Sequence, residues 1–182
     1  MSTISNLSGI ITAMQSEDEG YVGIFGDRYH EYPVSKRNGV LSQLKEVERI
    51  GNGIGGGTEA GVWIGLDQAI KNGTHYDNIF IYSDMQAGHG GLYGRDGVIK
   101  DHATRGGYGT KYMDVAKMVD TYRRKVNPKV NVFMVQIAGY NNVAMPEYGY
   151  RTNILGGWTG KEVVFAKEMN EFWDMKDQSR KK

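Results

Sequence analysis

Two oxygen-bearing side chains lie where the chain could hold a divalent metal ion. Thr58 closes the glycine string "GIGGGT", residues 53–58, and Asp84 follows the apolar run "NIFIYS", residues 78–83. A hydroxyl and a carboxylate are hard oxygen donors of the kind that Mg²⁺ and Mn²⁺ prefer. One helix and one strand between them would return Asp84 to the end of the sheet where Thr58 lies. We therefore predict a Mg²⁺ or Mn²⁺ site with Thr58 and Asp84 as ligands; the alternative is that Thr58 caps a helix and Asp84 caps a turn.

The glycine string does not fit the usual phosphate-binding loops. A P-loop needs a lysine followed by Ser or Thr after its last glycine, and "GGGT" has no lysine. A dinucleotide-binding loop follows a first strand, whereas these glycines follow a helical pattern. The chain also lacks cysteine and any Gly-x-Ser-x-Gly sequence, so acyl transfer has little support. We predict that the chain is not an enzyme; the alternative is a metal-dependent hydrolase or phosphoryl-handling enzyme that uses Asp84 with His89.

Residues 85–111 combine positive charge with aromatic side chains in a glycine-rich segment. Its length of roughly 27 residues exceeds that of ordinary connections, and we expect it to lack secondary structure. Basic groups interleaved with stacking faces suit single-stranded RNA. We predict a loop that binds RNA or a protein partner; the alternative is a solvated loop without a partner. The residues that would make the contacts are His89, Tyr93, Arg95, Lys100, Arg105 and Tyr108.

The elements that must position these residues follow from the spacing of apolar side chains. Strands are predicted at 21–25, 29–33, 78–83, 130–139 and 152–157, the first two joined in a hairpin at Gly26-Asp27. Helices are predicted over 40–50, 62–70, 112–122 and 165–173, the last with Thr159 as N-cap, after an N-terminal helix that begins near Ile4. Strands that are apolar on both faces and separated by helices imply a mostly parallel sheet covered on both sides. The predicted fold class is a doubly wound α/β domain over residues 1–176, with a polar C-terminal tail at 177–182.

Composition restricts the class of protein further. The 182 residues carry 22 basic and 21 acidic side chains, so there is no broad basic excess of the kind that a stand-alone nucleic-acid binder shows. The absence of cysteine is typical of a reducing compartment. No apolar run approaches the roughly 20 residues that span a bilayer. We predict a cytoplasmic protein without a membrane partner.

Several stretches resemble the von Willebrand factor A domain. "GGGTEAGVWIGLDQAI" and "YDNIFIYSDMQAG" resemble two of the three loops of that family's metal-ion-dependent adhesion site, and "YVGIFGDRYHEYPVS" resembles its second and third strands. "VNVFMVQIAGYNN" and "TNILGGWTGKEVVFA" resemble the last strands and helix as they occur in the Ro-type, or TROVE, proteins. In those proteins the domain is the C-terminal part of a ring-shaped binder of small noncoding RNA. The resemblance implies a non-catalytic binding module in a small-RNA ribonucleoprotein, or one that docks a protein partner.

One part of the family pattern is missing. The first loop, Asp-x-Ser-x-Ser after the central strand, should precede the N-terminal helix, but "MSTISNLSGIITAMQ" has no aspartate and no strand before its serines. A sheet without its middle strand has an unpaired edge, which can pair with another chain. We therefore predict a partner polypeptide that supplies the strand and the Asp-x-Ser-x-Ser loop. The alternatives are that the chain is a C-terminal piece of a longer or split protein, that the domain has lost metal binding, or that it is a structural fragment that completes another chain's fold.

Overall fold

The computed structural model describes residues 2–56, 61–83, 103–105, 111–113, 115–137 and 149–180. The helices are α1 (Ser2–Met14), α2 (Val40–Asn52), α3 (Gly61–Asn72), α5 (Val115–Lys125) and α6 (Glu162–Ser179). The strands are β1 (Gly20–Phe25), β2 (Tyr29–Val34), β3 (Asn78–Ser83), β4 (Ala103–Arg105), β5 (Lys111–Met113), β6 (Asn131–Gln136) and β7 (Thr152–Gly156). Within this part of the chain, no helix is long and apolar enough to cross a membrane.

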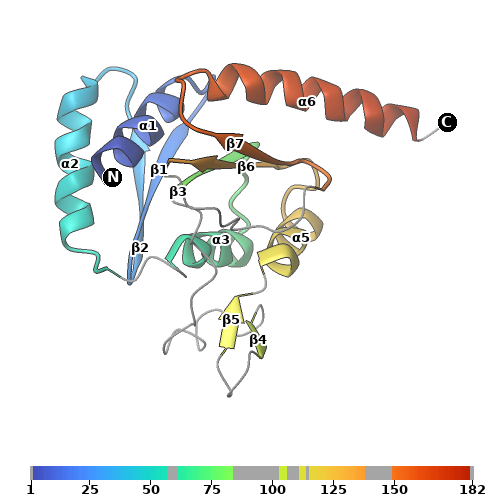
Figure 1. The fold of residues 1–182 in the computed structure, drawn as a ribbon, viewed down its shortest axis with the longest axis horizontal. Helices are drawn as coiled ribbons and strands as arrows, with labels where there is room; N and C mark the ends of the chain where they lie inside the picture. The colour runs from blue at the N-terminus through green and yellow to red at the C-terminus, as the bar shows by residue number, and fades with distance from the viewer. Residues whose placement is uncertain are drawn as a thin grey trace.

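A parallel sheet of β3, β6 and β7, in that order, forms the middle of the molecule (Figure 1). The central strand β6 is buried from Asn131 to Val135, as expected for an apolar strand covered on both faces. On one face, Phe133 packs edge-on against Phe165 of α6, with ring centroids 6.1 Å apart. On the other face, α3 and α5 contribute Ala69 and Tyr122 to a second buried cluster. The predicted strands at 78–83, 130–139 and 152–157 are confirmed in position, with β6 shorter than expected.

The hairpin of β1 and β2 is antiparallel and turns at Gly26-Asp27, as predicted. It packs with α1 and α2 around a core that includes Ile10, Val22 and Val47. In Figure 1 the hairpin runs crosswise to β6 and β7. Among the described strands, no backbone pairing joins it to the parallel sheet. The α/β class is thus confirmed, but the single continuous sheet that the sequence pattern predicted is not seen in these residues.

Two predictions about the segment before α5 are wrong. The helix begins at Val115 and not at Tyr112, because Lys111–Met113 pairs antiparallel with Ala103–Arg105. These short strands, β4 and β5, lie in or beside the 85–111 segment, for which the sequence predicts no secondary structure. Three residues are too few to distinguish the period of a strand from that of a helix, so the apolar pattern could not show this boundary.

Both ends of α6 also differ from expectation. The N-cap is Lys161 and not Thr159, and no side-chain hydrogen bond caps the helix. Thr159 lies two residues earlier, where the Glu162 carboxylate accepts its backbone N–H at 2.7 Å. At the other end α6 continues through Ser179, so the predicted boundary of the tail at 177 falls inside the helix. The helix extends beyond the sheet (Figure 1).

The turn before β3 is held by a buried tyrosine from α5. The hydroxyl of Tyr122 accepts the backbone N–H of Tyr76 at 2.8 Å and donates to the carbonyl oxygen of Thr74 at 2.9 Å. The side chain of Asn127 donates to the carbonyl oxygen of Tyr76 at 2.8 Å. Since Tyr122 is fully buried, these bonds fix where β3 begins.

Tyr122→Phe is expected to lower the free energy of unfolding by about 1–2 kcal/mol, because the ring stays while two backbone groups lose their partner. Urea denaturation followed by circular dichroism measures this. Tyr21→Phe is the matched control, since Tyr21 is 40% exposed and its hydroxyl donates only to the neighbouring Glu19. Equal stability of the two variants would contradict the anchoring role of Tyr122.

Candidate functional site

The residues predicted to bind metal and RNA lie almost entirely outside the described residues. Arg105 alone falls inside them, as the last residue of β4. The predicted positions outside them are Thr58, Asp84, His89, Tyr93, Arg95, Lys100 and Tyr108. Their predicted roles therefore stay predictions from sequence.

Glycines fix both ends of the loop that carries Thr58 against the β1–β2 turn. A Cβ atom on Gly61 would lie 2.4 Å from the carbonyl oxygen of Gly26, and one on Gly26 would lie 2.2 Å from that of Gly55. Gly55 also has a φ of 92°, a conformation that side chains disfavour. Gly26, Gly55 and Gly61 thus permit a close approach of three backbone segments at the end of the hairpin.

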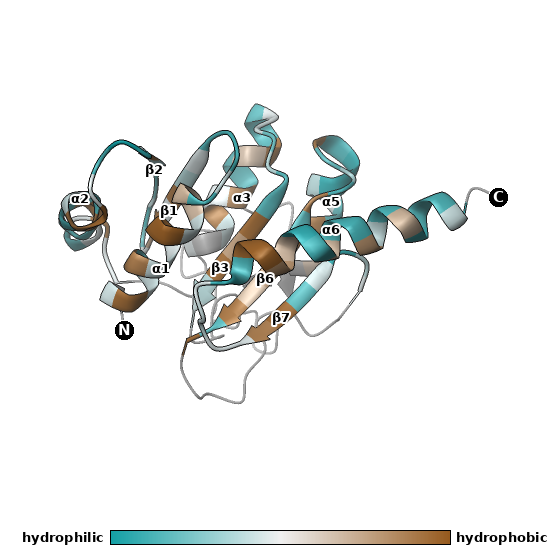
Figure 2. Ribbon diagram, turned by 90° about the horizontal axis from the view of Figure 1, so that it is seen from above, coloured by the Kyte–Doolittle hydropathy of each residue, from teal (hydrophilic) through white to brown (hydrophobic). Residues whose placement is uncertain are grey.

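A large cavity lies between the hairpin and the parallel sheet, with a volume of about 1120 Å³. Its wall includes residues of β1, β3, α1, α3 and α6, among them Val22, Phe80, Gly9, Trp63 and Ala166. Figure 2, which is coloured by hydropathy, shows apolar stretches along β3 and β6. The cavity therefore runs beside an apolar strand and has helices on both of its sides.

The edge of β3 that faces this cavity has no backbone partner among the described residues. β3 pairs with β6 on its other edge, where the carbonyl oxygens of Asp77 and Ser83 accept N–H groups. Because hydrogen-bonding direction alternates along a strand, the N–H and C=O groups of Asn78, Phe80 and Tyr82 point to the cavity edge. The first three residues of β3 are only partly buried, unlike the corresponding residues of β6. β3 is thus an open, apolar edge strand.

The tyrosines around the cavity are unsuited to proton transfer at neutral pH. Burial raises the pKa of Tyr82 to about 12, although its hydroxyl shares a hydrogen bond with that of Thr12. Burial also raises the pKa of Tyr29 and of Tyr76, both of which donate to the carboxylate of Glu31. A general base needs a pKa near the working pH. These hydroxyls therefore serve as neutral hydrogen-bonding groups.

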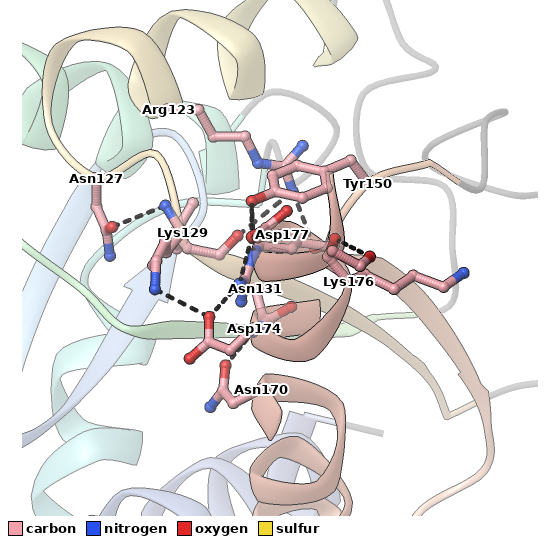
Figure 3. A network of polar contacts seen from close by, with 12 residues as sticks. Arg123, Asn127, Lys129, Asn131, Tyr150, Asn170, Asp174, Lys176 and Asp177 are labelled. Atoms are coloured by element: carbon pink, nitrogen blue, oxygen red, sulfur yellow. Dashed lines mark hydrogen bonds and ion pairs between the residues drawn. The ribbon is translucent and has the colours of Figure 1, made fainter. Parts of the chain in front are cut away.

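A second polar cluster joins the loop before β7 to α6 (Figure 3). The guanidinium of Arg151, whose side chain is 1% exposed, donates to Asp174 at 2.6 Å and to Asp177 at 3.0 Å. Its Nε donates to the hydroxyl of Tyr150 at 2.9 Å, and Lys129 pairs with Asp174 at 3.0 Å. These groups form hydrogen bonds and ion pairs with one another, so the cluster has a structural role and holds α6 to the loop before β7.

Neighbouring hydrogen-bond donors lower the pKa values of the two carboxyl groups of this cluster. Hydrogen bonds from Lys129 and then Arg151 lower the pKa of Asp174, and hydrogen bonds from Tyr150 and then Arg151 lower that of Asp177. The sequence reasoning missed this cluster. Its one local signal was the spacing of Asp174 and Asp177, three residues apart in a helical segment, which places two carboxylates on one helix face.

Among the residues that the structure describes, no group of three or more His, Asp or Glu side chains could hold a metal ion. Since Thr58 and Asp84 lie outside those residues, this does not test the predicted site. A scan against protein-family models found no match, and searches of curated proteins and of solved structures found none either. The resemblance to the von Willebrand A domain therefore rests on the quoted residues alone.

Proposed function

We propose that this chain is a non-catalytic binding module that docks a protein partner by accepting one of the partner's β-strands along the open edge of β3. The observation that carries the proposal is the coincidence of that edge with a cavity of about 1120 Å³. An exposed strand edge is a template for pairing with another chain, and strand addition is a common mode of peptide recognition. In the family that the sequence resembles, a central strand lies at this position, which is a second reason to expect an occupant here.

The surroundings of the cavity define the chemistry of the strand. Residues of α1, α3 and α6 line the cavity. Figure 1 shows α1 and α6 above the strands and α3 below them. A strand covered on both sides reads as a continuous apolar run and pairs most often in parallel. Six residues, the length of β3, extend about 20 Å. The partner strand is therefore apolar on both faces, about six residues long and parallel to β3.

The same strand explains the predicted metal site. In the resembling family the central strand ends in the Asp-x-Ser-x-Ser loop, which joins the threonine and aspartate loops at one edge of the sheet. We propose that the partner's loop joins Thr58 and Asp84 in the same way to bind Mg²⁺ or Mn²⁺. The site would serve recognition, and the buried tyrosines of the cavity wall, whose pKa values are raised by burial, would contribute to it as neutral hydrogen-bonding groups.

A synthetic strand peptide tests the proposal. We define it as Lys-Lys-Val-Val-Ile-Val-Val-Ile-Asp-Gly-Ser-Gly-Ser, in which the two lysines keep it soluble. A peptide that binds only the folded chain, at about 100 times its Kd, stabilises by about 2.7 kcal/mol. The expected rise in the midpoint of thermal unfolding is roughly 5–10 °C. Differential scanning calorimetry measures it.

Two controls locate the peptide. A peptide with prolines at its second and fourth apolar positions cannot complete the ladder and should give no shift. A cysteine added to the strand peptide should form a disulfide with Asn6→Cys, on the cavity wall, and not with Leu41→Cys, which is 71% exposed on α2. Equal effects of the two peptides, or no binding, would overturn the proposal. Binding of single-stranded RNA in place of the peptide would favour the RNA hypothesis instead.

A further inference from the structure

One buried donor on the cavity wall has no acceptor. Trp63, the third residue of α3, is fully buried and lines the cavity. Its indole Nε1 has no hydrogen-bond partner within the described part of the chain. An indole nitrogen only donates, so only an oxygen or another acceptor can satisfy it. Buried polar groups are nearly always paired, and each exception calls for an explanation.

Other polar side chains on the cavity wall have hydrogen-bond partners. The hydroxyls of Thr12 and Tyr82 pair with each other, and Asn78 accepts a hydrogen bond from Asn170. Of the buried side-chain nitrogen and oxygen atoms that lack a partner in the described residues, Nε1 of Trp63 is the one whose residue lines this cavity. A phenylalanine at this position would leave no unpaired donor, so the indole nitrogen is the atom that calls for an acceptor.

We propose that the indole N–H of Trp63 selects the partner strand by donating to the hydroxyl of a threonine on the strand's α3-facing side. This rests on the proposed function, since it names a group on the same strand. A hydroxyl fits better than a carboxylate, because an isolated charge in an apolar wall costs far more to bury than a neutral acceptor. Threonine also suits a strand, since β-branched side chains favour extended backbone.

A threonine scan of the strand peptide tests the inference. Each apolar residue is replaced in turn by threonine and, separately, by valine, which has nearly the same shape without the hydroxyl. At one position the threonine peptide should bind the wild-type chain about 3- to 10-fold more tightly than the valine peptide, as expected for one net hydrogen bond. The preference should vanish in Trp63→Phe. This double-mutant cycle isolates the contact between the two groups.

Nitrogen-15 NMR of the indole groups gives a readout that does not depend on the variant's stability. The chain has three tryptophans, and loss of one peak in Trp63→Phe assigns the Trp63 signal. On binding of the threonine peptide, the Trp63 N–H peak should move downfield, while that of Trp158, which does not line the cavity, should stay. Binding of both peptides with equal affinity at every position, and no shift of the Trp63 peak, would overturn this inference and leave the proposed function intact. Failure of the wild-type chain to bind any strand peptide would overturn the proposed function itself.

Discussion

Replacement of Arg151 by methionine is expected to lower the free energy of unfolding by about 2–4 kcal/mol. Methionine keeps much of the buried volume, but the change removes charge-assisted hydrogen bonds to Asp174 and Asp177, each worth about 1.5–3 kcal/mol. The two carboxylates keep partial contact with water, with side-chain exposures of 44% and 24%, so the loss stays below that of a fully buried pair. Urea denaturation with a constant m-value measures the change.

Lys129→Met is the matched control for Arg151→Met. Lys129 pairs with the carboxylate of Asp174, as Arg151 does, but the Lys129 side chain is 60% exposed, so the loss should be well under 1 kcal/mol.

The pH dependence of the free energy of unfolding gives a second check on the role of Arg151. Lowered pKa values of Asp174 and Asp177 stabilise the fold above the unfolded-state pKa of about 4, and this contribution disappears as pH falls through the folded values. The wild type should lose more stability between about pH 4 and pH 2 than Arg151→Met. Parallel pH curves would show that Arg151 does not hold these carboxylates.

Gly61→Ala is expected to lower the free energy of unfolding by about 1–2 kcal/mol. The added Cβ would lie 2.4 Å from the carbonyl oxygen of Gly26, which is backbone and cannot rotate away. The β1–β2 turn and the start of α3 must therefore separate, and overpacking of this kind costs about 1–3 kcal/mol. The gain in helix propensity, up to about 1 kcal/mol near a helix start, offsets only part of that cost. Thermal and urea denaturation measure the net effect.

Gly56→Ala is the matched control, because a Cβ at Gly56 meets no atom within 4 Å. Gly56→Ala should change the free energy of unfolding by no more than about 0.5–1 kcal/mol. The change is expected to be stabilising, because alanine reduces the conformational entropy of the unfolded chain. If Gly61→Ala is as stable as Gly56→Ala, the close approach of Gly61 to Gly26 does not contribute to stability.

The periodic segments of the sequence predicted the secondary structure well, because apolar spacing determines which face each element buries. The hairpin at Gly26-Asp27, the helix over 40–50 and the strand at 78–83 are all confirmed. The crosswise position of the hairpin was not predictable in this way. It depends on the packing of α1 and α2 around Val22 and Val47, which are contacts between distant segments.

The candidate site could be predicted only as an unpaired strand edge. The resemblance to the von Willebrand A domain predicted an unpaired strand edge, and β3 has a free edge beside a cavity among the described residues. No feature of the sequence pointed to a binding role for Trp63, because an apolar residue at helical spacing is typical of a buried core. No feature of the sequence pointed to Arg151 either. Its carboxylate partners, Asp174 and Asp177, lie 23 and 26 residues downstream and contact it only because α6 packs against the loop before β7.

Two of the buried clusters in the described part of the chain belong to different groups of elements. One buried cluster belongs to α1, α2 and the hairpin, and another belongs to α3, α5 and the strands beside them. The hydrogen bond between Thr12 and Tyr82 and the close approach of Gly61 to Gly26 join these two groups of elements. A strand seated in the cavity would contact both groups and couple their local opening more strongly. The partner would then affect the cooperativity of folding as well as the shape of the site.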